Sequence, residues 1–337
     1  MPRMTLIRLA GIIPVVLLVS AVIFGLLRLA PGDAADMLVS PEASEQEVAM
    51  ARQRWGLDEP LPAQYLKFVV NMARLDFGKS FRYHEDVFSL IRLRMPATLE
   101  LAAVSIVLAS LLALPFGVLA AVRKGGVLDN LVSIVAIAGV SAPTFWMGIL
   151  LVLVFSGELK LLPSSGRLPL GSDLVPVTGF NLIDALLAGR LDLLRQALMF
   201  LLLPAVTLAL NMMGIITRVT RSAVIDVAQE DFVSTAVAKG LSRSRIVFRH
   251  LVPNALVPVT TIVGLELGAL ISGSIIVEVV FSWPGMGTLL YQAISVRDIP
   301  LTTGIVVVYT FIFILINILI DLAYLIIDPR VRAAQAK

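Results

Sequence analysis

The chain of 337 residues contains no cysteine, which excludes disulfide bonds, thiol catalysis and metal sites built on thiolates. Only two histidines are present, His84 and His250, and they lie too far apart in sequence to predict a histidine metal site. Charged residues are also scarce, at 15% of the chain with a formal net charge of +3. Because the lysines and arginines cluster at the ends of apolar runs, we interpret them as topology signals rather than as a nucleic-acid surface.

Apolar residues, by contrast, are abundant. They make up 58% of the chain, whereas an ordinary soluble protein has about 45–50%. A helix that crosses a bilayer needs about 20 predominantly apolar residues, and six runs meet this length. We therefore predict an all-α polytopic membrane protein with six transmembrane helices, at residues 9–27, 101–122, 131–155, 197–216, 255–277 and 304–327.

The first run, residues 9–27, is either a cleaved signal peptide or a retained helix. Its 19 residues exceed the roughly 7–15 residues of a signal-peptide core, and no convincing cleavage site follows, so we favour a retained helix. Flanking Arg3 and Arg8 place the amino terminus in the cytoplasm, because short loops rich in Lys and Arg stay on that side. Six crossings then return the carboxyl terminus to the cytoplasm.

These assignments divide the chain into parts with different surroundings. We expect a cytoplasmic amino terminus with the first helix (1–29), a periplasmic insert (30–97) and a transmembrane core (98–327). The core contains a cytoplasmic loop at 218–253, and a cytoplasmic tail follows at 328–337.

The insert is predicted to be structured rather than a linker. Ser44 followed by Glu47 forms a capping box that opens a short helix. A second helix is expected to begin near Pro62, with Tyr65 and Phe68 on one face. The aromatic side chains of the insert can pack onto the membrane domain or contact a partner, and the sequence leaves both possibilities open.

Proline and glycine are expected to interrupt the core in three places. Pro143 should kink the third span. The loop after that span is rich in Gly and Pro at first and is expected to be helical from about 182 to 194. After the fifth span, residues 281–287 (FSWPGMG) predict an external turn in which Trp283 suits the membrane interface.

The cytoplasmic loop 218–253 carries the strongest topology signal, with six Lys or Arg residues. We predict a helix from about 231 to 239, whose start is stabilised by the negative charges of Glu230 and Asp231. Gly240 is expected to end this helix in the left-handed conformation.

A second short helix is expected to follow, with Ser242 as its cap and an end before Pro253. Two short helices at an angle would form a protruding elbow, the name used below for residues 230–253. The first helix is predicted to present Phe232 and Ala236 on one face. The small side chain of Ala236 at the tip would let a partner's groove approach the backbone closely.

Two other interpretations of the elbow have weaker support. Ala236, Gly240 and Ile246 match the small, turn and packing positions of a DNA-binding helix-turn-helix. However, only 38 residues separate the flanking spans, too few for an independent three-helix domain. A helix that merely lies on the membrane surface is the remaining alternative.

Enzyme motifs are incomplete. Gly78-Lys79-Ser80 suggests a phosphate loop, but the pattern needs a glycine at position 73, which is Ala73. A membrane-embedded hydrolase would need a base beside its nucleophile, and His250 lies in the cytoplasmic loop. We therefore expect no ATP site and no catalytic residue in this chain.

The elbow resembles the EAA loop of permease subunits of ATP-binding-cassette importers, whose pattern is E-A-A-x3-G-x9-I-x-L-P. Aligned on Gly240, the chain also matches the pattern at Ala236 and Pro253. It departs from the pattern at four positions, Ser234, Thr235, His250 and Val252.

The surrounding sequence is closer to one branch of that family, the dipeptide, oligopeptide and nickel permeases. The branch has GEDY-x-RTARAKGL and RHALRNALLPV where this chain has QEDFVSTAVAKGL and RHLVPNALVPV. Further marks of the branch recur along residues 5–332: RLAPGD (28–33), GLDEP (56–60), DFGKS (76–80), PATLE (96–100), FSWPG (281–285) and DPR (328–330). The long insert resembles the first, B-type subunit, and VTGFNLID (177–184) is most similar to the dipeptide members.

The resemblance implies a type I importer permease fold in a bacterial inner (plasma) membrane. It also implies an importer of five parts: a periplasmic binding protein, this chain, a paralogous permease and two cytoplasmic ATPases. ATP and magnesium would be bound by the ATPases, so this subunit would hold no cofactor and no metal, and its other contacts would be with membrane lipid.

The resemblance further implies that residues 230–241 form the coupling helix, seated in a groove of an ATPase. Movement of the ATPases would then be converted into alternating access, with ATP and loaded binding protein biasing the same equilibrium. The residues expected to carry this coupling are Glu230, Asp231, Phe232, Ala236, Lys239, Gly240 and Leu241.

Two polar residues inside predicted spans are candidates for the translocation pathway. Glu266 lies near the centre of the fifth run, where an ionisable group costs at least a few kcal/mol, so a functional role is the default expectation. The related permeases often have glutamine there, and pairing with a neighbouring helix is the alternative. Asn211 can equally join two helices by a hydrogen bond.

Peptides are the favoured substrates, with dipeptides first. Nickel, glutathione and opine-like solutes remain alternatives within the branch. A stand-alone secondary transporter would need its own coupling-ion site and often shows internal repeats, and the sequence indicates neither.

Overall fold

The computed structural model describes residues 14, 16–25, 44–55 and 58–327. The chain divides into two compact units, which we describe separately. Unit 1 comprises residues 1–96 and 284–318, and unit 2 comprises residues 97–283 and 319–337.

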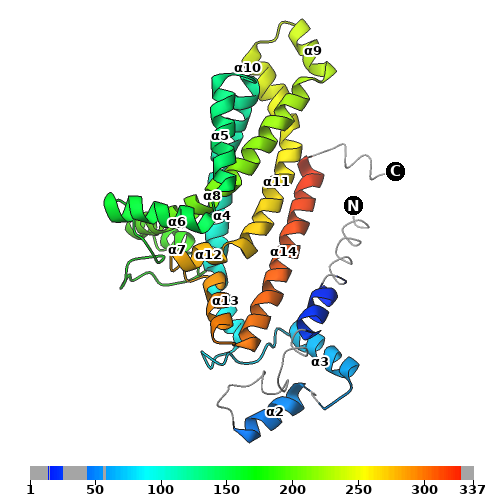
Figure 1. The fold of residues 1–337 in the computed structure, drawn as a ribbon, viewed down its shortest axis with the longest axis vertical. Coiled ribbons are helices and arrows are strands. Elements are labelled where there is room, and N and C mark those ends of the chain that lie inside the picture. The colour runs from blue at the N-terminus through cyan, green and yellow to red at the C-terminus, as the bar shows by residue number, and fades with distance from the viewer. Residues whose placement is uncertain (1–13, 15, 26–43, 56–57, 328–337) are drawn as a thin grey trace. The chain divides into compact units, whose positions relative to one another are not determined.

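The described residues are mostly helical, and they contain no strand. The first helices are α2 (Glu45–Trp55), α3 (Leu61–Ala73) and α4 (Val87–Val122), shown in Figure 1. The elements that follow are α5 (Val127–Ser141), α6 (Thr144–Leu151), the π-helix η1 (Val152–Glu158), α7 (Asn181–Leu187), α8 (Leu191–Ala228), α9 (Asp231–Ala238), α10 (Arg243–Ile246), the π-helix η2 (Val247–Leu251), α11 (Val252–Gly273), α12 (Ile275–Val280), α13 (Met286–Ser295) and α14 (Ile299–Ile327).

Several of these helices are long and apolar enough to cross a membrane, which confirms the predicted fold class. Among the described residues there are four such helices, and a fifth span if α5 and α6–η1 count as one. These two arms meet at 103°, a much sharper bend than the kink expected at Pro143. The predicted helix at 9–27 lies partly outside the described residues, and Val16–Gly25 is its described apolar helical part.

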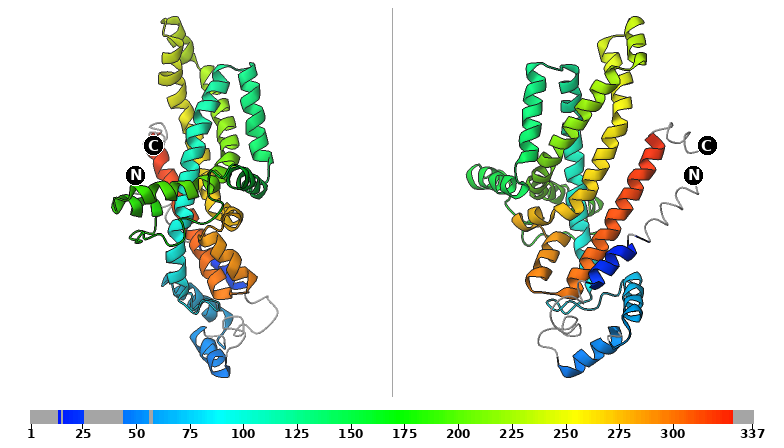
Figure 2. Two further views of the ribbon diagram at one scale, coloured as in Figure 1. Left: turned by 90° about the vertical axis from the view of Figure 1, so that its left-hand side faces the viewer. Right: turned by 45° about the vertical axis from the view of Figure 1, so that its right-hand side comes forward.

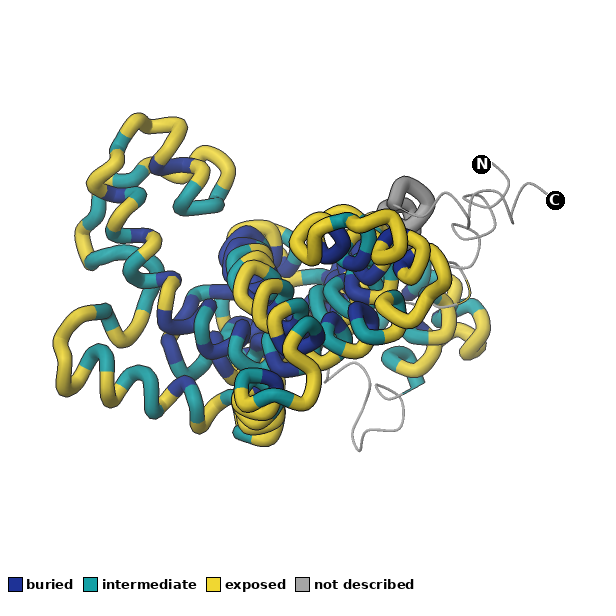
Figure 3. The backbone as a smooth tube through the Cα atoms, turned by 90° about the horizontal axis from the view of Figure 1, so that it is seen from above, coloured by how far each residue is buried: buried dark blue, intermediate teal, exposed yellow. Residues whose placement is uncertain are grey.

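Helix α8 is the central helix of unit 2, and α5, α6, α7 and α11 pack against it. Its buried residues recur every three or four positions and therefore share one face of the helix. They include Leu201, Ala205, Leu208, Met212 and Ile216. Figure 3 shows buried, half-buried and exposed stretches following one another along the backbone.

The contact between α5 and α8 is close enough to require a glycine. A Cβ atom at Gly214 of α8 would collide with the carbonyl oxygen of Ala136 and the side chain of Val140, both on α5. With no side chain at this position, the two backbones can approach each other directly.

The helices extend beyond the predicted spans. Helix α4 begins at Val87, so the last part of the predicted insert is helical, and α8 continues to Ala228, well into the predicted loop. Hydropathy locates the apolar part of such a helix but not its polar ends, which continue the same backbone hydrogen bonds in water. In contrast, α11 ends at Gly273, earlier than predicted, and Ser274 separates it from α12.

The helix predicted from 182 to 194 is broken into two. Helix α7 ends at Leu187 and α8 begins at Leu191. Gly189 between them has a φ angle of +65°, a left-handed conformation that ends a helix. The apolar pattern continues across this break, so it did not indicate the change of direction.

Trp283 is buried in unit 2, with 1% of its surface exposed, so its predicted place at the membrane interface is wrong. The indole Nε1 donates a hydrogen bond to the backbone oxygen of Ala97 at 2.9 Å. The guanidinium of Arg167 lies 5.4 Å from the centre of the ring, and it also pairs with Glu100 at 2.5 Å. These polar partners allow a residue typical of the interface to sit inside the protein.

The described part of the insert, residues 44–55 and 58–97, is structured, as the sequence predicts. Its capping box is confirmed: the Ser44 backbone N–H donates to Glu47 at 2.8 Å, and the Glu47 N–H donates to the Ser44 hydroxyl at 3.4 Å. Helix α3 begins at Leu61 and buries Phe68. Phe68 and Phe77 are both buried, so packing rather than a partner explains these two aromatic residues.

Within unit 1, the buried carboxylate of Asp298 accepts two hydrogen bonds from the insert. The Ser80 hydroxyl donates to Asp298 at 2.6 Å, and the Arg82 backbone N–H donates to the same oxygen at 3.2 Å. Nearby, the Tyr83 hydroxyl donates to Gln292 at 2.6 Å. Ser80 belongs to the segment that resembled a phosphate loop, and here its hydroxyl instead binds a carboxylate of the same chain.

Candidate functional site

The elbow lies at one end of unit 2, where α8 ends and α11 begins. Helix α9 extends past the ends of both helices, and the two further views agree on this (Figures 1 and 2). Most residues of α9 are exposed. The predicted protrusion is therefore present.

The first helix of the elbow has the predicted bounds and the predicted stop. Glu230 occupies the N-cap position, and Asp231 lies in the first turn. Gly240 has a φ angle of +71°. Its N–H donates to Val237 at 2.9 Å, and the N–H of Leu241 donates to Ala236 at 3.3 Å. These two bonds form the Schellman motif, which ends helices at glycine.

The face that α9 presents is not the predicted one. Ala236 is only 5% exposed, and Val233 is also buried, whereas Phe232 is 38% exposed. Residues 233 and 236 are three positions apart and share one side of the helix, and α9 packs against α10. Ala236 therefore lies on the inner side of the elbow and does not form an exposed tip, so that prediction is wrong.

The other predicted coupling residues form the outer surface of the elbow. Glu230, Asp231 and Lys239 are exposed, as is Gly240, and Leu241 is half-buried. The outer surface thus combines one aromatic side chain, Phe232, with charges of both signs.

The second helix of the elbow does not end before Pro253. Helix α10, η2 and α11 follow one another without a break, and Arg243–Leu270 is one continuous candidate span. In the widened π-helical turn, the N–H of Val252 donates to Val247, five residues earlier. The Asn254 side chain donates to the His250 carbonyl at 2.7 Å. Pro253 lacks a backbone N–H, and it lies in the first turn of α11, through which the helix continues.

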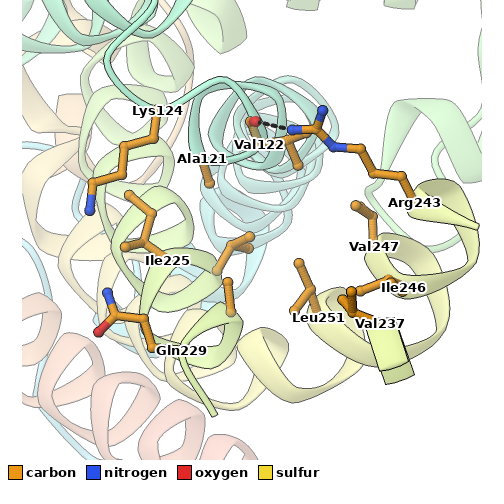
Figure 4. A pocket seen from close by; sticks show the side chains of 12 residues that line it. Ala121, Val122, Lys124, Ile225, Gln229, Val237, Arg243, Ile246, Val247 and Leu251 are labelled. Carbon is orange, nitrogen blue, oxygen red and sulfur yellow. Dashed lines mark hydrogen bonds between the residues drawn. The ribbon is translucent and has the colours of Figure 1, made fainter. Parts of the chain in front are cut away.

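Ser242 stands at the N-cap position of α10, but its side chain makes no capping hydrogen bond. Arg243, the next residue, makes the long-range contact. Its Nη2 donates to the carbonyl oxygen of Val122 at 2.8 Å, at the carboxyl end of α4 (Figure 4). This bond joins the base of the elbow to a neighbouring helix.

A second arginine fixes the helix that leads into the elbow. Arg221 of α8 donates to both carboxylate oxygens of Asp129 on α5, at 2.5 and 2.8 Å. Asp129 also accepts the N–H of Gly125 at 2.8 Å. In the sequence, Arg221 and Arg243 stand out only as topology signals, and neither contact is predicted. The position of Asp129 in the first turn after Gly126 was the one available signal.

The two pathway candidates lie on helices that pack together. Asn211 is on α8 and Glu266 is on α11, and both side chains are half-buried. Helices α8 and α11 make extensive contact with each other.

Comparisons with known proteins match nearly the whole chain. Residues 113–333 match the family described as binding-protein-dependent transport system inner membrane component, and residues 1–102 match the amino-terminal family of such membrane components. The chain is 42% identical over 325 residues to the probable D,D-dipeptide transport system permease protein of Escherichia coli, covering 96% of both chains. It is also 42% identical over 327 residues to the di/tripeptide transport system permease protein of Pseudomonas aeruginosa, covering 96% of this chain and 97% of the relative. A glutathione transport system permease protein of Salmonella paratyphi A is 36% identical over 325 residues, covering 96% of this chain and 97% of the relative.

A solved structure shares the fold. An inward-facing structure of the MetNI methionine ABC transporter superposes with a TM-score of 0.54 at 19% identity. The match covers 71% of this chain and 96% of that chain. At this level of identity, the likeness concerns the fold alone.

Proposed function

This chain belongs to the family of binding-protein-dependent transport system inner membrane components, and from that premise we propose how it works and what it carries. It is a permease subunit of an ATP-binding-cassette importer and a multi-pass membrane protein. Its proposed partners are a paralogous permease, two cytoplasmic ATPases and a periplasmic binding protein. In this assembly the elbow faces the cytoplasm, both termini are cytoplasmic, and ATP and magnesium are bound by the ATPases.

The observation that carries the proposed coupling mechanism is the exposed outer face of α9. Phe232 is an apolar side chain with no role in the core of the elbow, and Glu230, Asp231 and Lys239 surround it with charge. A short helix that presents one aromatic anchor within a polar rim suits the groove of a partner. Seated in an ATPase, α9 would transmit closure of the ATPases to α8 and α11.

The elbow would transmit movement through connections that are short and hydrogen-bonded. Helix α8 runs without a break to Ala228, two residues before α9's N-cap, and α10 continues into α11. The bonds from Arg221 to Asp129 and from Arg243 to Val122 tie these segments to α5 and α4. A displacement of α9 is therefore passed on to several helices rather than absorbed by a flexible loop.

For the pathway, we propose that Glu266 faces the translocation cavity, together with Asn211 on the adjoining helix. The support is the half-buried position of both residues on two packed membrane helices. Glu266→Gln is the test, because it removes the charge and keeps the shape. The variant should change uptake differently for substrates of different charge, and unchanged uptake of all of them would exclude the proposal.

Dipeptides and oligopeptides are the proposed substrates. The support is the extent of the likeness to two relatives whose names specify dipeptides or di- and tripeptides, each covered over at least 96% of its length. Glutathione, itself a tripeptide, is the second candidate because one relative is named for it. Mass spectrometry of the small molecules retained by the purified binding protein would distinguish them. Retained nickel or an opine would refute the substrate while leaving the importer intact.

Reconstitution tests the importer mechanism itself. Proteoliposomes containing both permeases should take up a labelled dipeptide only when the ATPases, ATP and the loaded binding protein are all present. Omission of the ATPases is the control. Uptake driven by a proton gradient alone would contradict the mechanism and support a secondary transporter.

A further inference from the structure

A pocket of about 370 Å³ opens beside the elbow, entirely within unit 2. Its walls come from the end of α4, the last turns of α8, and α9, α10 and η2 (Figure 4). The interior is largely apolar, with Val224, Ile225, Val247 and Leu251 among the lining residues. This volume falls within the range of roughly 300–1,000 Å³ that is typical of ligand pockets.

The pocket lies at the ends of two helices that are candidate membrane spans. One candidate span ends at Val122, and another begins at Arg243. The hydrogen bond of 2.8 Å between Arg243 and the Val122 carbonyl holds these two helix ends at the same level. The pocket therefore lies beside the ends of both candidate spans, where we expect lipid headgroups.

Two cations stand on opposite sides of the pocket. Figure 4 shows Lys124 on one side and Arg243 on the other, with apolar side chains between them. Among the lining residues none is acidic, and the remaining polar side chain is the neutral Gln229. Asp129, the acid in the first turn of α5 just after Lys124, already pairs with Arg221. The surroundings therefore favour a ligand with an anionic end.

The other acids of this region are outside the pocket. Asp226 and Glu230 are adjacent in sequence to lining residues, but both are exposed and neither contributes to the wall. They reduce the positive potential in the surrounding water without occupying the space between the cations.

We propose that this pocket binds an anionic phospholipid of the adjoining leaflet, with an acyl chain in the apolar interior and the headgroup at Lys124 and Arg243. A lipid combines a long apolar tail with an anionic head, and it is present at the end of a membrane span. Clusters of cations at the cytoplasmic ends of membrane helices bind such headgroups. The bound lipid would fill the space between α4, α8 and the elbow, and so would make the stiffness of the elbow depend on membrane composition.

Native mass spectrometry of the full chain would test this proposal. The chain is titrated with phosphatidylglycerol and, separately, with phosphatidylcholine of the same acyl chains. The wild type should bind phosphatidylglycerol more tightly. Lys124→Gln should weaken that binding by about fivefold, the effect of one cation at a membrane surface. Ala228→Phe, at an exposed lining position, should weaken it by filling the pocket.

Arg123→Gln is the matched control. Arg123 is exposed in the same loop as Lys124 but does not line the pocket, so its loss should leave binding unchanged. An equal loss in Arg123→Gln would show a diffuse surface charge and overturn the proposal. Equal binding of phosphatidylcholine, or displacement of the lipid by inorganic phosphate at the same concentration, would also overturn it.

A further arm tests whether a protein occupies the pocket instead. The titration is repeated with the complete importer, in which the ATPases cover the elbow. Tight binding of phosphatidylglycerol should persist there. Loss of the lipid whenever the ATPases are bound would identify the pocket as part of the protein interface and refute the lipid site.

Discussion

Asp129 and Arg221 join α5 to α8 through two hydrogen bonds, from Nε to Oδ1 at 2.5 Å and from Nη2 to Oδ2 at 2.8 Å. The Asp129 side chain is 3% exposed and that of Arg221 is 31% exposed. Bidentate pairs of this kind fix orientation as well as distance. Since α8 continues directly toward the elbow, the pair sets the direction of the helix on which the elbow stands.

The first prediction concerns this pair. Asp129→Ala leaves the Arg221 guanidinium partly buried without its carboxylate, so we expect the free energy of unfolding to fall by about 3 kcal/mol. This is the lower end of the range for buried pairs, because Arg221 is partly solvated. A thermal-unfolding assay of the purified chain should show a lower melting temperature, and ATP-driven uptake should fall with it.

A matched control uses an exposed pair of the same residue types. Asp192 pairs with Arg190 at 2.8 Å, and both side chains are more than 40% exposed. Asp192→Ala should change stability much less than Asp129→Ala, because exposed pairs contribute little. Equal effects of Asp129→Ala and Asp192→Ala would contradict the structural role of the Asp129–Arg221 pair.

The second prediction concerns the end of α9. Gly240 has a φ angle of +71°, and a Cβ atom there would meet nothing within 4 Å. The cost of Gly240→Leu is therefore conformational, about 1–2 kcal/mol. We expect the variant to insert into the membrane but to uncouple ATP hydrolysis from uptake in proteoliposomes. Gly240→Asn should retain coupling, because asparagine tolerates the left-handed conformation. Normal transport by Gly240→Leu would refute the elbow mechanism.

The third prediction separates the two faces of α9. Phe232→Ala removes the exposed aromatic side chain, and we expect ATPase binding to weaken at least about tenfold, as for an interface anchor. The melting temperature of the isolated chain should hardly change. Phe248→Ala is the control, since Phe248 is 71% exposed on η2 and lies outside the predicted contact. Binding assays that gave equal losses for both variants would exclude Phe232 as the anchor.

The features that sequence analysis predicted correctly depend on neighbouring residues. The capping box of Ser44 and Glu47 spans three positions, and the stop at Gly240 depends on one residue and its backbone. Apolar runs likewise located the candidate membrane helices among the described residues, because the bilayer imposes a length on each run separately. Each of these features is determined by residues that lie within one short segment of the sequence.

The features that sequence analysis missed depend on distant residues. Asp129 and Arg221 are separated by 92 positions, and Glu100 and Arg167 by 67. Ala236 has the small side chain expected of a contact surface, yet the packing of α9 on α10 turns it inward. Neither a charge nor a small side chain reveals its partner until helix directions are known. Trp283 is the clearest example. Tryptophan usually prefers the membrane interface, but here its side chain is buried against Ala97 and Arg167.

The fourth prediction tests this position of Trp283. Trp283→Phe keeps an aromatic ring near Arg167 but removes the hydrogen bond to Ala97, so we expect unfolding to become easier by about 1 kcal/mol. Trp146→Phe is the control, because Trp146 is exposed. Chemical unfolding followed by circular dichroism would compare the two variants. A larger effect at Trp146 would be inconsistent with a buried, hydrogen-bonded Trp283.

The fifth prediction concerns pH and the loop before α7. Asp184 is buried and accepts hydrogen bonds from the Thr178 N–H at 2.8 Å, the Thr178 hydroxyl at 2.7 Å and the Gly179 N–H at 3.0 Å. Burial raises the pKa of this carboxyl group, but the bonds from Thr178 and Gly179 outweigh it, and the net pKa is lowered. A lowered pKa in the folded state means that the ionised group stabilises the loop.

That stabilisation is complete above the unfolded-state pKa of about 4 and is lost as the pH falls through the lower, folded-state pKa. Hydrogen exchange at residues 178–184, corrected for the intrinsic effect of pH, should therefore show strong protection at pH 6 and progressive loss below about pH 4. Asp184→Asn should give weak protection throughout. Asp173→Asn is the control, because Asp173 is an exposed acid of the same loop that pairs with Arg190 instead. Protection at 178–184 that depended on the charge of Asp173 and not on that of Asp184 would refute the stabilising role of Asp184.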